Sequence, residues 1–191
     1  MNNKQIVSVL GGGSFGTVLA NLAASNGSNV ALWVRDSEQA LRINSEGANS
    51  SYHPELKLSD NIMASEDLYE VVKNADLIFV ATPSKIFEKI IVRISKIIKE
   101  DCYVISCTKG ILDDPFRTMT DIILSNNVKN FGVLSGPNLA KEIADNKVAG
   151  TVIASNDQQM ITSVKEVLSS VTFKIYSCLL YTSPSPRDTN E

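Results

Sequence analysis

Residues 6–16 read IVSVLGGGSFG, and the architecture expected for the chain follows from this stretch. Ile6 to Leu10 has the length and apolar composition of a buried strand. The glycines that follow, Gly11, Gly13 and Gly16, match the spacing GxGxxG. Beyond them apolar residues recur at helical spacing. A strand, a glycine loop and a helix in this order predict the phosphate-binding turn of a dinucleotide-binding fold.

Each glycine has its own expected role in such a turn. Gly11 permits the tight turn, Gly13 lets the backbone approach a pyrophosphate, and Gly16 lets the helix pack closely on the strand. The start of the helix offers free N–H groups and a partial positive charge to the phosphates. The alternative is a glycine-rich turn that binds nothing.

The rest of the chain alternates apolar runs of strand length with segments of helical period. This pattern predicts an α/β fold with a Rossmann-type, doubly wound, mostly parallel sheet. Further strands are expected over 30–34, 77–81, 102–107, 131–134, 151–154 and 173–176. Helices are expected after Asp36 (with Gln39 closing a capping box), over 67–73, 86–98 and 140–144, from Pro115 toward 124, and up to 168. The polar stretch 47–61 is expected to be a long loop.

The composition excludes several classes of protein. The chain has 191 residues, of which 43% are hydrophobic and 20% charged, and this balance suits one folded domain. A net charge of −3 argues against a nucleic-acid-binding surface. Apolar runs stay shorter than the roughly 18 residues of a membrane span. Cys102, Cys107 and Cys178 form neither a metal-binding pattern nor a disulfide framework. A cytoplasmic protein without a metal site is therefore expected.

The end of the second strand is where cofactor preference is expected to be set. Arg35 and Asp36 follow the strand directly. An acidic residue there accepts hydrogen bonds from the ribose hydroxyls of NAD, whereas an arginine pairs with the extra phosphate of NADP. Because Arg35 comes first, NADP is favoured and NAD remains an alternative. The competing interpretation is that Asp36 only caps a helix and Arg35 is a solvated surface charge.

Later strand ends supply one cation and one histidine to consider. Lys109 follows the strand over 102–107 and precedes a glycine, where it could hold the phosphate or carboxylate of a substrate. A surface lysine in a turn is the alternative. His53 lies in the expected long loop beside a proline, and a surface position is favoured over a catalytic role.

Five segments then occur in the order and at the spacing of a known family: VLGGGSFGTVLANLAASNG, LWVRD, VATPS, CTKGI and LSGPNLAKEIA. Together with the loop SSYHPELKLSDNI they closely resemble the NAD(P)-dependent glycerol-3-phosphate dehydrogenases of the bacterial type. The resemblance covers residues 4–177. It implies reversible hydride transfer between NAD(P)H and dihydroxyacetone phosphate, which yields sn-glycerol 3-phosphate for phospholipid synthesis.

The resemblance also implies roles for single residues. Ser14 and Phe15 match cofactor contacts of the glycine loop, Arg35 matches the contact to the adenosine phosphate, and Ala140 matches a further cofactor contact. Lys109 resembles a lysine that touches both cofactor and substrate. Gly136 and Asn138 match substrate contacts, with Asn138 standing where a serine or threonine is frequent.

The resemblance stops at Ser177, so residues 1–177 are expected to form the cofactor-binding domain and 178–191 a disordered tail foreign to the family. The family's helical second domain, with its catalytic lysine and a phosphate-binding Arg-Asn pair, has no counterpart in this sequence. A truncated protein that binds cofactor and turns over poorly is therefore expected, while a homodimer is expected of the full-length family member. The alternatives are a non-catalytic dinucleotide-binding module and a dehydrogenase of the ketopantoate or 6-phosphogluconate type.

Overall fold

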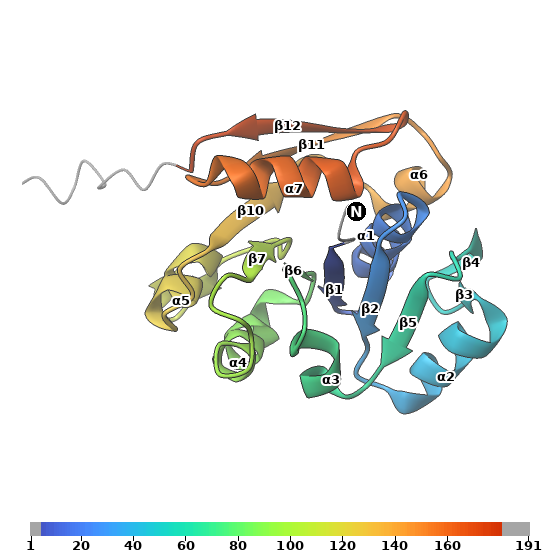
Figure 1. Ribbon diagram of the computed structural model, residues 1–191, viewed down its shortest axis with the longest axis horizontal. Helices are drawn as coiled ribbons and strands as arrows, with labels where there is room; N and C mark the ends of the chain where they lie inside the picture. The colour runs from blue at the N-terminus through green and yellow to red at the C-terminus, as the bar shows by residue number, and fades with distance from the viewer. Residues whose placement is uncertain (1–4, 181–191) are drawn as a thin grey trace, which may run out of the picture.

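A single eight-stranded sheet forms the centre of the molecule in the computed structural model, which describes residues 5–180 (Figure 1). Its order is β12-β11-β10-β7-β6-β1-β2-β5. The bounds are β1 Ile6–Leu10, β2 Asn29–Trp33, β5 Ile62–Ser65, β6 Leu77–Val80, β7 Tyr103–Ser106, β10 Phe131–Ser135, β11 Ala149–Ala154 and β12 Phe173–Cys178.

Within this sheet the neighbouring strands β5, β2, β1, β6, β7 and β10 are all parallel, and β11 and β12 run in the opposite direction. β11 pairs with β10 in antiparallel fashion and with β12 in parallel fashion. The prediction of a doubly wound, mostly parallel sheet is confirmed. Each strand expected from the sequence is present. The edge strand β5 is an addition, and its four residues, IMAS, include only two buried positions, unlike the fully apolar runs of the central strands.

Seven helices connect the strands within residues 5–180: α1 Ser14–Ser25, α2 Ser37–Glu46, α3 Leu68–Val72, α4 Ser84–Ile94, α5 Met119–Ser125, α6 Ala140–Ala144 and α7 Gln158–Leu168. α1, α6 and α7 lie against one face of the sheet, and α3, α4 and α5 against the other (Figure 1). Helices on both faces bury both sides of the parallel strands, so these strands are apolar at nearly every position.

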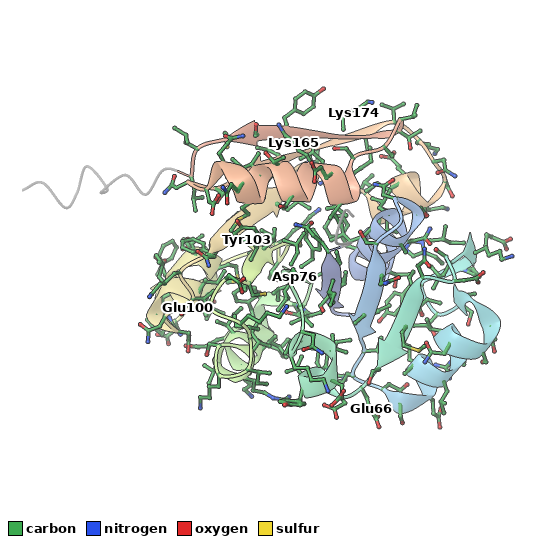
Figure 2. The ribbon with its side chains drawn as sticks, viewed as in Figure 1. Glu66, Asp76, Glu100, Tyr103, Lys165 and Lys174 are labelled. Carbon is green, nitrogen blue, oxygen red and sulfur yellow. The ribbon has the colours of Figure 1, made fainter. Side chains whose placement is uncertain are left out.

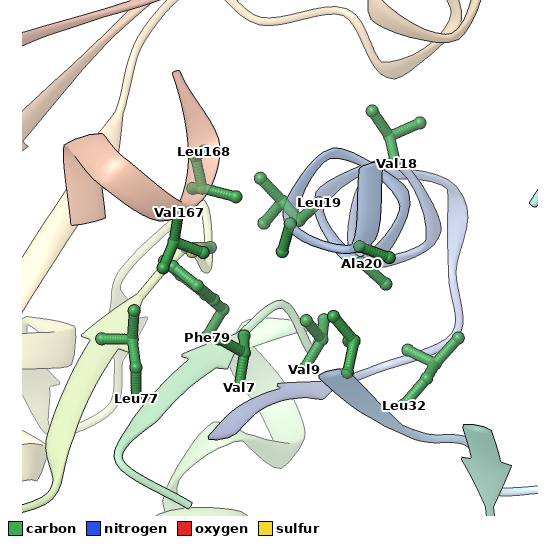
Figure 3. Close-up of a cluster of buried hydrophobic side chains, with 14 of the residues drawn as sticks. Val7, Val9, Val18, Leu19, Ala20, Leu32, Leu77, Phe79, Val167 and Leu168 are labelled. Atoms are coloured by element: carbon green, nitrogen blue, oxygen red, sulfur yellow. The ribbon is translucent and has the colours of Figure 1, made fainter. Parts of the chain in front are cut away.

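The core is accordingly divided into two clusters by the sheet. Alternate residues of a strand point to opposite faces, so Val9 joins the cluster beneath α1 and α7 while Leu10 joins the one beneath α4. Figure 3 shows the first cluster, in which Val7, Val9 and Phe79 of the sheet face Leu19 and the pair Val167 and Leu168. Cys107 belongs to the first cluster and Cys102 to the second, so these two cysteines face opposite sides of the sheet.

Two segments differ from the expectation. The stretch expected as a loop over 47–61 contains an antiparallel hairpin of β3 (Ala48–Asn49) and β4 (His53–Lys57). The helix expected from Pro115 begins later, because β8 (Leu112–Asp113) and β9 (Phe116–Arg117) form a second hairpin first. The following helix, α5, begins with a capping box, in which the Thr118 and Asp121 side chains accept hydrogen bonds from each other's backbone N–H groups.

The C-terminal boundary of the sheet lies at Cys178, one residue beyond the expected end of the domain. The expectation of a disordered tail falls mostly on residues 181–191, which lie outside the described residues. Among the helices of residues 5–180, none has the length and apolar composition that crossing a membrane requires.

Candidate functional site

The carboxyl edge of the parallel strands collects the candidate residues. Leu10, at the end of β1, pairs with Trp33 of β2 on one side and with Val80 of β6 on the other. The chain therefore leaves β1 in one direction and later returns on its other side, which makes the β1 end a topological switch point. Val80 pairs in turn with Ser106 of β7, so the loops after these strands lie side by side.

The glycine loop has the geometry that its spacing predicts. Gly11 has a φ of +122°, and a Cβ there would lie 2.5 Å from the carbonyl oxygen of Ala81. A Cβ on Gly16 would lie 1.9 Å from the carbonyl oxygen of Gly11. A Cβ on Gly13, by contrast, would meet nothing within 4 Å. Two glycines are thus required by the protein's own packing, and Gly13 leaves the backbone open to a ligand.

The start of α1 presents hydrogen-bond donors at this open position. Gly13 is the N-cap of the helix and supplies no side-chain cap. The N–H groups of the first turn have no intrahelical acceptors, and they carry the positive end of the helix dipole. An open glycine in front of free donors fits a dinucleotide pyrophosphate.

Ser14 and Phe15 follow directly, and the side chain of His53 reaches the first of them. His53 Nε2 lies 2.9 Å from the Ser14 hydroxyl and 3.0 Å from the Ser14 carbonyl oxygen. The expectation of a surface position for His53 is wrong: only 7% of the residue is exposed, because the β3–β4 hairpin packs it against α1. Phe15 packs against the hydrophobic cluster beneath α1 and α7.

A cavity of about 350 Å³ opens beside Ser14, between the β3–β4 hairpin and α6. It is lined by Ser14, Tyr52, His53, Pro54, Glu55, Leu56, Lys141, Ala144 and Asp145. Charged side chains and apolar side chains both line this cavity, which adjoins the start of α1.

The residues after β2 divide their roles. Asp36 caps α2, where its carboxylate accepts from the Glu38 N–H at 3.0 Å. The capping role considered for Asp36 is therefore confirmed, although the capping box with Gln39 is wrong: Gln39 donates to the Gly12 carbonyl oxygen instead. Arg35 is exposed at the same edge as the glycine loop.

Lys109 and Asn138 meet across the ends of β7 and β10. The Lys109 ammonium donates to the Asn138 carbonyl oxygen at 3.1 Å. Asn138 is 4% exposed, and its amide donates to the Thr151 hydroxyl at 2.9 Å while its Oδ1 has no partner within residues 5–180. Gly136 lies against β11, and Ala140 is the first residue of α6.

Further polar side chains line the same edge. The Thr108 hydroxyl contacts the carbonyl oxygens of Val80 and Thr82 at 3.2 and 2.8 Å, which ties the ends of β6 and β7 together. Thr82 Oγ1 and Ser106 Oγ are buried without a partner in the described part of the chain. Unpaired buried oxygens gathered at one sheet edge are unusual in a packed protein and are frequent where a ligand or water completes the site. Burial raises the pKa of the Cys107 thiol, so this group stays protonated and is no nucleophile.

Sequence reasoning missed Gln39, Asn49 and His53 as residues of this site. Asn49 is 2% exposed and donates to the Gly12 carbonyl oxygen at 3.0 Å. These residues lie 27 to 39 positions from the loop residues they contact. The helix stop at Gly47 just before Asn49 is the only local signal that a new element begins there.

Comparisons with known proteins agree with this geometry. Residues 6–161 match the model of the family described as "NAD-dependent glycerol-3-phosphate dehydrogenase N-terminus". Glycerol-3-phosphate dehydrogenases [NAD(P)+] of Alcanivorax borkumensis and Teredinibacter turnerae are each 42% identical over 91% and 93% of this chain. The chain spans about half the length of these curated relatives, 51% and 52%.

The solved structure of glycerol-3-phosphate dehydrogenase from Coxiella burnetii superposes with a TM-score of 0.86 at 29% identity. The superposition covers 92% of this chain and 54% of that one. The overall arrangement of the sheet and helices is therefore shared with that part of the protein.

Proposed function

The chain belongs to the family of NAD-dependent glycerol-3-phosphate dehydrogenases, and from this premise we propose that its residues form the cofactor-binding domain of such an enzyme. The observation that carries the proposal is the contrast among the glycines: Gly11 and Gly16 are closed by backbone, and Gly13 is open. The open face lies at the switch point of the sheet, where the fold places a dinucleotide.

The glycine loop is proposed to hold the pyrophosphate of NAD or NADP. Gly13 and Ser14 bring backbone donors to the phosphates, and the Ser14 hydroxyl adds a further polar contact. Phe15 of α1 and Ala140 of α6 are proposed as further cofactor contacts. These residues supply orientation as well as affinity, since several fixed donors act together on one anion.

Arg35 is proposed to favour NADP. Its exposed guanidinium stands at the end of β2, where a 2′-phosphate on the adenosine ribose would lie. Asp36 is already engaged at the α2 N-terminus, so its carboxylate is less available to the ribose hydroxyls of NAD. Arg35 thus contributes the cofactor-specific contact, and NAD binds without it.

Lys109, Gly136 and Asn138 are proposed to hold the substrate, dihydroxyacetone phosphate or sn-glycerol 3-phosphate. When bound, the reduced nicotinamide supplies the hydride that reduces the substrate's carbonyl carbon. The Lys109 ammonium offers charge-assisted hydrogen bonds to an anionic substrate. The unpaired Asn138 Oδ1 accepts a hydrogen bond from a substrate hydroxyl, and Gly136 lets the loop that carries Asn138 pack closely against β11.

Reduction of the carbonyl also needs a proton on its oxygen, and the catalytic lysine implied by the family resemblance has no counterpart among these 191 residues. We therefore expect the chain to bind cofactor while turning over poorly. The family match favours this reading over a dehydrogenase of the ketopantoate or 6-phosphogluconate type. The retained Lys109 contact favours descent from an enzyme over a purely non-catalytic binding module.

Equilibrium titration of the full chain with NADPH and NADH, followed by nicotinamide fluorescence, tests the proposal. Saturable binding with a dissociation constant between about 1 μM and 1 mM is expected. When dihydroxyacetone phosphate is added to the NADPH complex, little of the NADPH should be oxidised. Absence of saturable binding overturns the cofactor proposal, and rapid oxidation overturns the expectation of poor turnover.

Arg35→Ala tests the preference for NADP. The variant should lose about tenfold in NADP+ affinity and little in NAD+ affinity, since only the former has the extra phosphate. Arg93→Ala removes an exposed arginine from α4 and serves as the charge-matched control. Equal losses for both cofactors in Arg35→Ala would assign Arg35 to another part of the site.

A further inference from the structure

The carbonyl group of Gly12, inside the glycine loop, is held by side chains from outside the loop. Gln39 Nε2 donates to this oxygen at 2.7 Å and Asn49 Nδ2 at 3.0 Å. Gln39 comes from α2 and Asn49 from β3, which follows α2 directly. Two amide donors on one carbonyl restrict the direction in which that carbonyl can point.

The Asn49 amide is fully committed to this arrangement. Its nitrogen also donates to the buried Thr17 hydroxyl at 2.8 Å, and its oxygen accepts from Gln39 Nε2 at 3.2 Å. A reversed amide would turn the Asn49 oxygen toward the Gly12 oxygen and lose both donations. A single amide orientation therefore satisfies all of these partners.

The hydrogen bonds to the Gly12 oxygen also set the direction of the Gly13 N–H, because both groups belong to the same peptide unit. This peptide is planar and trans, so its N–H points opposite to its C=O. With the Gly12 carbonyl directed at Asn49 and Gln39, the Gly13 N–H points away from them. Within residues 5–180 the Gly13 N–H has no backbone acceptor, and no side chain within that range accepts from it.

The same hairpin also holds the other side of Gly13. Asn49 pairs with His53 in the β3–β4 register, and His53 Nε2 contacts both polar oxygens of Ser14. The hairpin thus touches the residue before Gly13 and the residue after it, while Gly13 itself stays open.

We propose that Asn49, assisted by Gln39, is a positioning residue that orients the Gly12–Gly13 peptide so that the Gly13 N–H faces the bound pyrophosphate. The inference rests on the proposed cofactor function. Asn49 touches no ligand in this scheme and acts only through the backbone it holds.

The test compares Asn49→Ala with Asn44→Ala in the full chain. Asn44 serves as the control because its amide also holds backbone away from the glycine loop: on β5 it donates to the Ala64 oxygen at 2.9 Å and accepts from the Ala64 N–H at 2.8 Å. NAD+ and NADP+ affinities are measured by calorimetry and stability by urea unfolding. Gln39→Met keeps the length of the side chain without its donor, and it replaces Asn49→Ala if that variant does not fold.

Asn49→Ala is expected to lower the affinity for both cofactors about tenfold, and Asn44→Ala to change either affinity by less than about twofold. The amide resonance of Gly13 in the unliganded protein should move in Asn49→Ala and stay in place in Asn44→Ala. Unchanged affinity in Asn49→Ala, or an equal loss in Asn44→Ala, overturns the inference alone. A wild-type chain that binds neither cofactor overturns the proposed function as well, so the two failures are distinguishable.

Discussion

The Lys109 ammonium lies 3.1 Å from the carbonyl oxygen of Asn138 and so joins the loops that follow β7 and β10. A neutral carbonyl orients the ammonium without cancelling its charge. The ion pairs found within residues 5–180 do not include Lys109. The cation is therefore positioned at the site edge and remains available to an anion.

Replacing Lys109 by methionine should weaken dihydroxyacetone phosphate binding to the NADP+ complex by about tenfold to a hundredfold, the range for a charge-assisted hydrogen bond. Binding would be followed by broadening of the substrate's NMR signals. Lys174→Met, an exposed lysine on β12, is the control for the change in net charge. Equal binding by Lys109→Met and Lys174→Met would remove Lys109 from the substrate site.

Alanine at Gly13 and at Gly16 should have opposite effects. Gly13 has a φ of −80° and open space, so Gly13→Ala should keep or slightly raise stability, by up to about 1 kcal/mol, because the unfolded chain loses freedom. The added methyl occupies the proposed phosphate position, so cofactor affinity should fall sharply. Calorimetric titration beside urea unfolding separates the two effects.

Gly16→Ala should destabilise the fold itself by about 2–3 kcal/mol or more, because its Cβ would lie 1.9 Å from the Gly11 oxygen. Gly27→Ala is a useful comparison in the turn after α1: its φ is +94°, but nothing lies within 4 Å of a Cβ there. The Gly27→Ala variant should lose stability through backbone strain alone, because its Cβ clashes with no neighbouring atom. A Gly16→Ala protein as stable as wild type would contradict the packing described for α1 and β1.

The sequence permits prediction of the β1–loop–α1 unit because every signal for it is local. The apolar strand, the glycine spacing and the helical period all lie within a short segment, and they agree. Lys109 and Asn138 could also be placed, since parallel topology brings the ends of β7 and β10 to one edge. The sequence alone could not predict that these two residues touch.

Asn49 and His53 escaped prediction because their importance is tertiary. β3 and β4 are short and polar, and they lack the apolar alternation that identifies a strand with one buried face. The side chains of Asn49 and His53 are buried because they contact α1, and no alternation of apolar residues in β3 or β4 indicates this contact. The capping box predicted for Gln39 fails for the same reason, because its partner, Gly12, is 27 positions away in the sequence.

The cysteines should differ widely in reactivity. Burial raises the pKa of Cys102 to about 12 and also raises the pKa of the fully buried Cys107. Cys178 is exposed on β12. Because the thiolate is the reactive form, a disulfide reagent at neutral pH should modify Cys178 rapidly and the other two only on unfolding. In Cys178→Ser the rapid phase should vanish. A rapid phase that persists would place another cysteine at the surface.

The amino edge of the sheet offers a test of acid stability that is separate from the site. Asp76, labelled in Figure 2, accepts from the Lys99 ammonium at 2.7 Å and from the Ile6 N–H at 2.9 Å. Desolvation alone would raise the pKa of Asp76, but these hydrogen bonds and the Lys99 charge outweigh it and lower the pKa below the ordinary 3.8.

A carboxyl whose pKa is lowered by folding contributes stability that is complete above its unfolded pKa and is lost as the pH falls through its folded pKa. Wild type should therefore be more stable than Asp76→Asn near neutral pH, and the difference should shrink below about pH 4 as Asp76 becomes protonated. Urea unfolding at a series of pH values measures this convergence. Glu166→Gln, at an exposed carboxylate on α7, should run parallel to wild type. A constant gap between wild type and Asp76→Asn down to the acid limit would mean that Asp76 stabilises β1 through packing and not through its charge.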